Sequence, residues 1–344
     1  MRRVIAAGFG VAIIIIAAVL LWPAPARGLV LYAALDYAPA IGKAFTKKTG
    51  IPVRVIRLST GALLARITAE GHHPDWDIGW FDGATAAVSL DTAGLLAHGL
   101  RPPVPLTATG RSMLPPDGAY IPTGFTLAGV FVMNKASTLK PPKTWNDLTA
   151  PLYHGVVGMN DPAISGPTYP ALAGMLKQAG GWPQGKGFVA ALKANGLQVF
   201  AKNDATLAAL RNGTIKLAIV QSSAAVNVAR NIDHHLTVIY PRPAYVLPNV
   251  IVLPKGLHGR ALREAKAFIA FVESPAGQAI RKREGEGDSY YWPVTALPAP
   301  RHALPPLTTL DLATLDAARW GAREKTVLAW FAHAIDSGAD HAQT

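Results

Sequence analysis

Cysteine is absent from this chain of 344 residues, which excludes disulfide bonds, thiolate metal sites and cysteine nucleophiles. Charged residues make up only 16% of the chain and hydrophobic residues 50%, a composition too apolar for a disordered protein. No G-x-S-x-G or H-E-x-x-H string occurs, so these two catalytic signatures are missing. Any chemistry must therefore come from oxygen and nitrogen groups, and the sequence nominates no catalytic pair and no cofactor.

One long apolar run stands at the N-terminus. Residues 4–22 carry no charge, Arg2 and Arg3 precede them, and the small residues 24–26 follow. This is the layout of a secretory signal peptide, so we expect cleavage after Ala26 and a periplasmic protein. The run is also long enough to span a bilayer, so an uncleaved anchor in the inner membrane is the alternative. The 318 of 344 residues that remain after cleavage exceed what one core usually supports, which favours two domains.

Basic residues outnumber acidic ones. The formal net charge is +12, and removal of Arg2 and Arg3 with the signal would lower it to +10. The densest basic cluster, residues 281–283, is followed at once by Glu284, so no long basic block exists. A basic exported protein can bind nucleic acid, an anionic membrane surface or small anions. Without a long basic block nucleic acid is disfavoured, and we expect a small anionic solute as the partner.

Strands and helices alternate from residue 29 onward. Short apolar runs at residues 29–33, 53–58 and 78–81 are separated by segments of helical periodicity. This order predicts an α/β fold with a parallel sheet, in which ligands bind at the carboxyl ends of the strands. The proline-rich stretch 102–122 reads as a surface connection.

The second half of the chain repeats the alternation. The expected strands are residues 125–133, 155–159, 215–220 and 249–253. The expected helices are residues 167–179, 187–194, 205–212, 224–231, 260–273, 275–283 and 310–334.

Four segments resemble bacterial extracellular solute-binding proteins, the capture subunits of ABC importers. They are LVLYAALDYAPAIGKAFTKKTGIPVRV, STGALLARITAEGHHPDWDIGW, PPKTWNDLTAPLYHGVVGMNDPAISGPTYPALAGML and NVIVLPKGLHGRALREAKAFIAFVESPAGQAI. They look like the branch that takes up ferric ion, 2-aminoethylphosphonate and similar small solutes. The tail after about residue 300 departs from that pattern.

The resemblance implies a two-lobed periplasmic binding protein type II fold with a hinge and a cleft between the lobes. The expected organisation is a signal peptide (1–26), the first part of lobe 1 (27–122), lobe 2 (123–242), a return to lobe 1 with C-terminal helices (243–295) and a helical extension (296–344).

Two loops that begin helices are candidate anion sites. Ser59, Thr60 and Gly61 stand between a strand and a helix, where backbone N–H groups and hydroxyls point to the strand ends. Ser165, Gly166 and Thr168 occupy the equivalent place in the second half. Helix capping is the structural alternative for both loops, and the resemblance favours ligand binding.

Further candidates follow other strands. Gln221, Ser222 and Ser223 stand where the resemblance leads us to expect a tyrosine pair in ferric-binding members, so they favour neutral donors over tyrosine-held iron. Asp36 and Asp82 each follow a strand and either bind a ligand amine or cap the next helix.

Tyr245 is a candidate contact or a packed aromatic. Adjacent histidines at 72–73 and 234–235 point apart and are interpreted as solvated loops, so no metal site is predicted.

The sequence thus predicts a periplasmic binding protein for a small anionic or zwitterionic solute, such as a phosphonate or phosphate ester. The expected protein is a monomer that delivers its solute to an inner-membrane ABC permease. A ferric-ion transport protein is the alternative within the class, and an exported hydrolase on a two-lobe scaffold is the alternative from another class.

Overall fold

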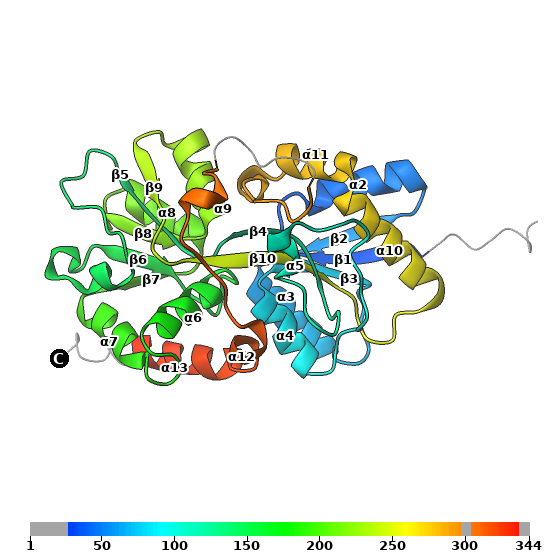
Figure 1. The fold of residues 1–344 in the computed structure, drawn as a ribbon, viewed down its shortest axis with the longest axis horizontal. Helices are drawn as coiled ribbons and strands as arrows, with labels where there is room; N and C mark the ends of the chain where they lie inside the picture. The colour runs from blue at the N-terminus through cyan, green and yellow to red at the C-terminus, as the bar shows by residue number, and fades with distance from the viewer. Residues whose placement is uncertain (1–26, 297–303, 337–344) are drawn as a thin grey trace, which may run out of the picture.

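A computed structural model describes residues 27–296 and 304–336 and forms two α/β lobes, each built on one mixed sheet (Figure 1). The expected signal peptide and part of the C-terminal extension lie outside these residues. Within them, no helix combines the length and apolarity needed to cross a bilayer.

Lobe 1 contains the first sheet, in the order β11-β10-β3-β1-β2 with β4 also paired to β10. Its strands are β1 (Leu29–Ala33), β2 (Val53–Arg57), β3 (Ile78–Asp82), β4 (Ile121–Leu127), β10 (Ala244–Val252) and β11 (Leu312–Ala313). Its helices are α2 (Ala38–Thr49), α3 (Thr60–Glu70), α4 (Ala84–Thr92), α5 (Ala108–Arg111), α10 (Gly259–Glu273) and α11 (Pro275–Glu284). Strands β1, β2 and β3 are parallel, as predicted, and β10 runs antiparallel to β3 and β4.

Lobe 2 contains the second sheet, in the order β7-β6-β8-β5-β9. Its strands are β5 (Val130–Asn134), β6 (Val157–Asn160), β7 (Gln198–Phe200), β8 (Leu217–Val220) and β9 (Leu236–Ile239). Its helices are α6 (Thr168–Gln178), α7 (Lys186–Ala194), α8 (Asn203–Arg211) and α9 (Ser222–Asn227), the last followed by a π-helical turn at Val228–Ile232. Short 3₁₀ turns lie at Asn146–Thr149, Pro151–Tyr153, Glu286–Ser289 and Leu307–Thr309.

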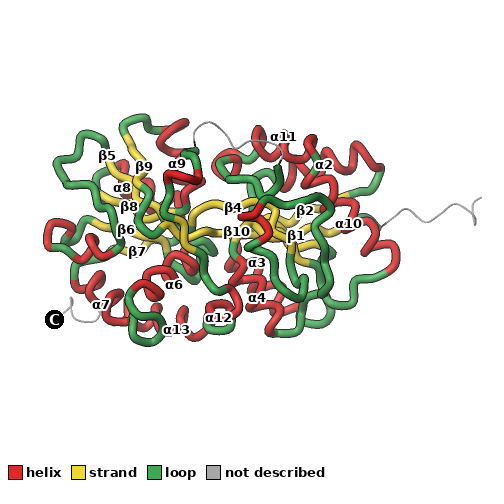
Figure 2. The backbone as a smooth tube through the Cα atoms, viewed as in Figure 1, coloured by secondary structure: helices red, strands yellow, loops and turns green. Residues whose placement is uncertain are grey.

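Helices cover both faces of each sheet (Figure 2). In β1, Leu29 and Leu31 join the core beneath α2 and α10, whereas Val30 and Tyr32 join the core beneath α3 and α4. Side chains alternate between the two faces of a strand, so a strand that is apolar throughout must be covered on both sides. This is why the central strand lacks an apolar–polar alternation.

The expected strand 125–133 is in fact two strands in different sheets. β4 pairs with β10 in lobe 1, and β5 pairs with β8 and β9 in lobe 2. The break falls at Gly129, where an added Cβ would lie 2.8 Å from the Trp145 ring. An apolar run cannot reveal this break because both halves are buried.

The proline-rich stretch also differs from the expectation at its end. Pro122 is buried within β4 and faces β10 at an irregularity in the strand pairing. A proline is tolerated there because a bulge removes the need for its missing N–H.

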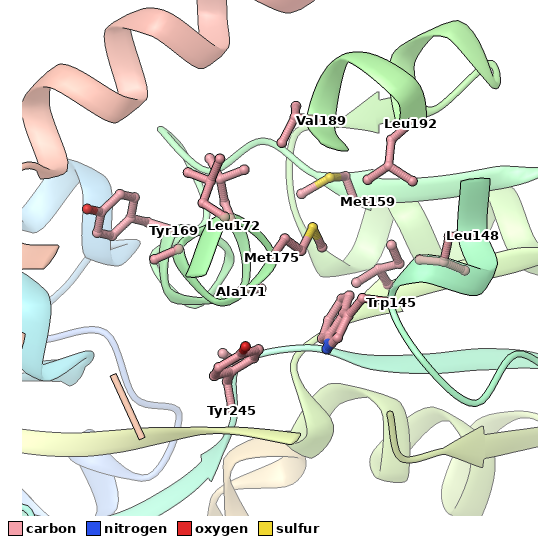
Figure 3. Close-up of a cluster of buried hydrophobic side chains, with 14 of the residues drawn as sticks. Trp145, Leu148, Met159, Tyr169, Ala171, Leu172, Met175, Val189, Leu192 and Tyr245 are labelled. Carbon is pink, nitrogen blue, oxygen red and sulfur yellow. The ribbon is translucent and has the colours of Figure 1, made fainter. Parts of the chain in front are cut away.

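The C-terminal segment contacts both lobes, and only part of it is helical as predicted. β11 pairs with β10, α12 (Ala317–Gly321) packs on α4, and α13 (Glu324–Asp336) packs on lobe 2. Val327 of α13 joins the core of lobe 2, which surrounds α6 (Figure 3). The Tyr169 hydroxyl of α6 donates to the Trp320 carbonyl at 2.5 Å.

Candidate functional site

The carboxylate of Asp82 at the end of β3 is the most constrained of the predicted site residues. Gln221, which follows β8 in lobe 2, donates from Nε2 to Asp82 Oδ2 at 3.3 Å and to Thr126 Oγ1 at 2.9 Å. The side-chain amide of Asn249 in β10 also donates to Asp82. These bonds join the end of a lobe 1 strand to the end of a lobe 2 strand. The two positions predicted from separate halves of the chain therefore meet.

Asp36 lies beside a carboxylate from a distant part of the chain. Arg57 Nη2 donates to Asp36 Oδ1 at 2.8 Å, and the Asp36 backbone N–H donates to Asp288 Oδ2 at 2.7 Å. Asp288 belongs to the 3₁₀ turn after α11, 252 residues from Asp36 in sequence. The charges of Asp36 and Asp82 both act on Asp288, so these three carboxyl groups form one acidic cluster.

All three carboxyl groups in this cluster have raised pKa values. Burial raises the pKa of Asp82 to about 6, with the charge of Asp36 adding to the shift and the two amide donors opposing it. Burial, followed by the charges of Asp36 and Asp82, raises the pKa of Asp288 well above its usual range. Burial also raises the pKa of Asp36, although Arg57 opposes this. A cationic group bound among them would favour the ionised carboxylates.

A cavity of about 270 Å³ lies between the lobes next to this cluster. Its lining comes from lobe 1 (Asp36, Glu286, Gly287, Asp288) and from lobe 2 (Asn203, Asp204, Leu207, Ala208, Arg211, Ser223, Ala224, Asn227, Val228, Ile232). Four carboxylates and one guanidinium therefore surround a space large enough for a small solute. The lining of the cavity is acidic although the whole chain is basic; Asp36 and Asp288 lie inside, and Asp204 and Glu286 are exposed at its rim.

The two predicted helix-start loops touch each other across the cleft. An added Cβ on Gly61 would lie 2.6 Å from the Ala163 carbonyl oxygen, and one on Gly166 would lie 2.2 Å from Thr60 Cβ. Only glycines allow this approach of the two backbones. The lobes are therefore closed against each other at this edge.

Hydroxyls in these loops have different environments. Ser59 Oγ accepts from the Ala62 N–H at 3.4 Å, so it caps α3. Ser165 Oγ accepts from Asn160 Nδ2 at 3.2 Å, and Asn160 also donates to Asn203 Oδ1 at 2.7 Å. Thr168 is buried at the start of α6. The polar network around Asn160 thus links the second loop to Asn203 in the cavity wall.

Ser222 and Ser223 differ although they are adjacent. Ser222 Oγ is fully buried and accepts from the Leu127 N–H at 2.9 Å, so it terminates β4 at the crossing between the lobes. Ser223 lines the cavity.

Tyr245 does not line the cavity. Its ring packs in the lobe 2 core, 6.4 Å from the Trp145 ring centroid and against Gly174 (Figure 3). Burial raises the pKa of Tyr245 to about 12.

Sequence reasoning did not select Asn203, Asp204, Arg211, Glu286 or Asp288. The only available signal was the presence of acidic residues just after α11 in a basic chain. A second missed cluster, Asp91, His98 and Asp117, brings three ligand atoms within 4.8 Å on the surface of lobe 1. The spacing of these three residues follows no metal motif.

A family model described as bacterial extracellular solute-binding protein matches residues 40–297. The chain belongs to this family. The resemblance carried by the four sequence segments is confirmed, and so is the α/β fold of periplasmic binding proteins. The protein is therefore the solute-binding component of an ABC transport system and not an enzyme.

Two related proteins are similar in sequence to this chain. An uncharacterised protein of Haemophilus influenzae is 27% identical over 293 residues, which cover 82% of each chain. The phosphoglycerate transport regulatory protein PgtC of Salmonella typhimurium is 29% identical over 164 residues, 48% of this chain and 39% of that protein.

Among solved structures, iron-bound HitA of Pseudomonas aeruginosa has a TM-score of 0.72 at 23% identity, covering 88% of this chain and 98% of that one. AfuA of Actinobacillus pleuropneumoniae with fructose-6-phosphate has a TM-score of 0.74 at 21% identity, covering 91% of this chain and 98% of that one. Identities this low show the fold alone.

Proposed function

We propose that the protein captures a small zwitterionic solute, with an amine at one end and a phosphonate or phosphate ester at the other, in the periplasm. It then delivers the solute to an inner-membrane ABC permease. The observation that carries the proposal is the cavity between the lobes, in which four carboxylates and an arginine meet. An amine balances the carboxylates, and an oxyanion balances the guanidinium.

The amine end belongs near Asp36 and Asp288. These two residues come from lobe 1, and the charge of Asp36 adds to the burial that raises the pKa of Asp288. An ammonium group that donates to them replaces this repulsion by charge-assisted hydrogen bonds, each worth roughly 1.5–3 kcal/mol.

The oxyanion end belongs near Arg211 and the polar groups of lobe 2. Arg211 of α8, Asn203 and Ser223 supply donors on that wall of the cavity. Two proteins similar to this chain have names that mention phosphorylated solutes, fructose-6-phosphate and phosphoglycerate.

Ferric ion is the second candidate because iron-bound HitA shares the fold. Within the described residues, the carboxyl groups at the cleft do not bring three ligand atoms within 4.8 Å of one another. Asp91, His98 and Asp117 form such a group, but they lie outside the cavity between the lobes. Serines occupy positions 222–223, so neither residue supplies a phenolate. These observations favour the zwitterion.

Calorimetry with matched solutes tests the proposal. 2-Aminoethylphosphonate should bind at least about 10-fold more tightly than either ethylphosphonate or ethanolamine, because each analogue makes only one of the two sets of charge-assisted hydrogen bonds. Ferric citrate should give no comparable heat. Equal binding of ethylphosphonate and 2-aminoethylphosphonate would refute the role of the carboxylates, and tight ferric binding would replace the proposal with the iron alternative.

The affinity should depend on pH through Asp82. Asp82 does not line the cavity, but its charge acts on Asp288, which does. A carboxyl with a pKa of about 6 is ionised above that pH, and its charge then attracts an ammonium group bound beside Asp288. The affinity for the aminated solute should therefore rise from pH 5 to pH 7.5, by about 10-fold for this single group.

The Asp82→Asn variant isolates this effect. It should bind the aminated solute roughly 10-fold to 100-fold more weakly at pH 7.5 and lose the extra pH dependence. Titration of the solute itself is common to both proteins and cancels in the comparison. Exposed Asp75→Asn is the matched control and should behave like the wild type. An affinity that falls with rising pH in the wild type alone would contradict the amine assignment.

A further inference from the structure

Three helices that cover one face of the first sheet carry most of their basic residues outward. α2, α10 and α11 pack over the core formed by Leu31, Trp80 and Phe268 (Figure 1). Outside this core they contribute eight lysines and arginines against two glutamates. These residues, here called the basic face, are Lys43, Lys47, Lys48, Arg260, Arg263, Lys266, Lys282, Arg283, Glu264 and Glu284. The formal charge of the face is +6.

Aromatic contacts hold α2 and α10 in one layer. The Phe45 ring of α2 lies 5.3 Å from the Phe268 ring and 5.8 Å from the Phe271 ring of α10. Lys48 Nζ lies 5.6 Å from the centre of the Phe271 ring. The lysines at the end of α2 therefore adjoin the surface of α10, and their positive charges add over one continuous area.

The charge of the basic face is poorly neutralised. Arg260 pairs with Glu264 at 2.6 Å and Arg283 with Glu284 at 2.7 Å. Within residues 27–296 and 304–336, no ion pair involves the exposed Lys43, Lys47, Lys48, Arg263 or Lys266.

The opposite face of the same sheet has no such excess. α3 and α4 carry Arg66, Glu70 and Asp91, and Arg66 pairs with Glu70 at 2.9 Å. The positive charge is thus concentrated on one side of lobe 1. A general need for solubility does not require this asymmetry, whereas attraction to an anionic surface does.

The place where the described chain begins favours a membrane as that surface. The Leu29 N–H donates to the Pro52 carbonyl at 2.8 Å, so the described chain begins beside the connection from α2 to β2. Lys47 and Lys48 precede this connection by a few residues. The 26 preceding residues include the uncharged run 4–22, long enough to span a bilayer. A retained run would hold the end of lobe 1 that bears the basic face close to the lipid.

We propose that the basic face binds the anionic phospholipid surface of the membrane from which the solute is taken up. This contact keeps the solute-binding cleft near the permease independently of cleavage of the N-terminal run. The contact involves none of the residues that line the cavity between the lobes, so it can be tested independently of the proposed solute.

Vesicle co-sedimentation tests the proposal on the full exported chain. At 50 mM salt the protein should bind vesicles of 30% phosphatidylglycerol in phosphatidylcholine at least about 10-fold more tightly than pure phosphatidylcholine vesicles, and 500 mM salt should remove the difference. A retained hydrophobic anchor would bind both vesicles alike and would not produce this difference.

The variant Lys43→Glu/Lys47→Glu/Lys266→Glu brings the charge of the basic face to zero. It should lose the preference for phosphatidylglycerol vesicles and bind both kinds of vesicle alike, because each basic residue near such a surface contributes roughly fivefold to binding. The control Lys140→Glu/Lys216→Glu/Lys325→Glu changes three exposed lysines elsewhere and the net charge equally, and it should retain binding. Both variants should keep the calorimetric affinity for the solute.

Two results would overturn this inference. Equal loss of binding in both variants would show that net charge, and not the basic face, is responsible. Absence of any preference of the wild type for phosphatidylglycerol would exclude a lipid partner and leave an acidic protein surface as the occupant.

Discussion

Replacing Gly166 with valine is expected to prevent full closure of the lobes and to weaken solute binding by at least about 100-fold. The Cβ of any larger residue at this position would lie 2.2 Å from Thr60 Cβ in the opposite lobe, which is closer than two non-bonded carbon atoms can approach. The lobes must then stay apart along this edge. Two or more charge-assisted hydrogen bonds from one wall of the cavity are lost as a result, each worth about 1.5–3 kcal/mol.

Small-angle scattering and calorimetry measure this effect together. The wild type should show a smaller radius of gyration when saturated with solute, whereas Gly166→Val should show almost no change. Its unfolding temperature without solute should stay close to that of the wild type, because the clash disappears when the lobes open.

The matched control is Gly187→Ala in α7, where nothing lies within 4 Å of an added Cβ. This variant should keep both the affinity and the compaction. Normal compaction of Gly166→Val on addition of solute would show that the contact between the two loops is not part of a closing clamp.

Replacing Arg281 with methionine is expected to destabilise the protein by about 3–5 kcal/mol. Arg281 is fully buried; its Nη1 donates to the Thr123 carbonyl at 2.7 Å and lies 3.6 Å from Glu273 Oε1. The guanidinium also lies 4.2 Å from the centre of the Tyr291 ring. Methionine fills much of the same volume but leaves the buried Glu273 carboxylate without its cation.

The loss should grow with pH. Burial raises the pKa of Glu273 to about 7, although Arg281 opposes the shift. Without Arg281 the pKa of Glu273 in the folded protein rises further above its value in the unfolded chain. Between these two pKa values the folded protein keeps the proton of Glu273, whereas the unfolded chain loses it. Stability then falls as pH rises above the unfolded pKa of about 4.5, up to the folded pKa. Chemical denaturation should show a larger deficit at pH 8 than at pH 5.

Two comparisons separate this mechanism from general damage. Arg283→Met removes a cation of the same helix that is exposed to solvent, and its effect should stay below about 1 kcal/mol. The double variant Arg281→Met/Glu273→Met should recover part of the loss, because a buried apolar pair has no unpaired charge. A single variant that is no less stable at pH 8 than at pH 5 would contradict the role of Glu273.

The sequence alone was sufficient for the family, the α/β class and most of the element order. Apolar runs such as residues 29–33 and 78–81 became β1 and β3, and the helical periodicity of residues 260–273 became α10. These features are local, because the period of side-chain burial is set by the strand or helix itself. The same locality placed Asp36 and Asp82 at strand ends, where a parallel sheet gathers its ligand-binding loops.

Only the tertiary structure decided which residues share the cleft. Asp288 accepts a hydrogen bond from the Asp36 backbone because α11 returns the chain to lobe 1. Ser222 accepts one from the Leu127 backbone because β4 ends at the crossing between the lobes. The single apolar run 125–133 belongs to two sheets for the same reason. Such contacts depend on how whole elements pack and on which lobe the chain enters next. The periodicity of a short segment reports its own burial, but it carries no information about the partner that buries it.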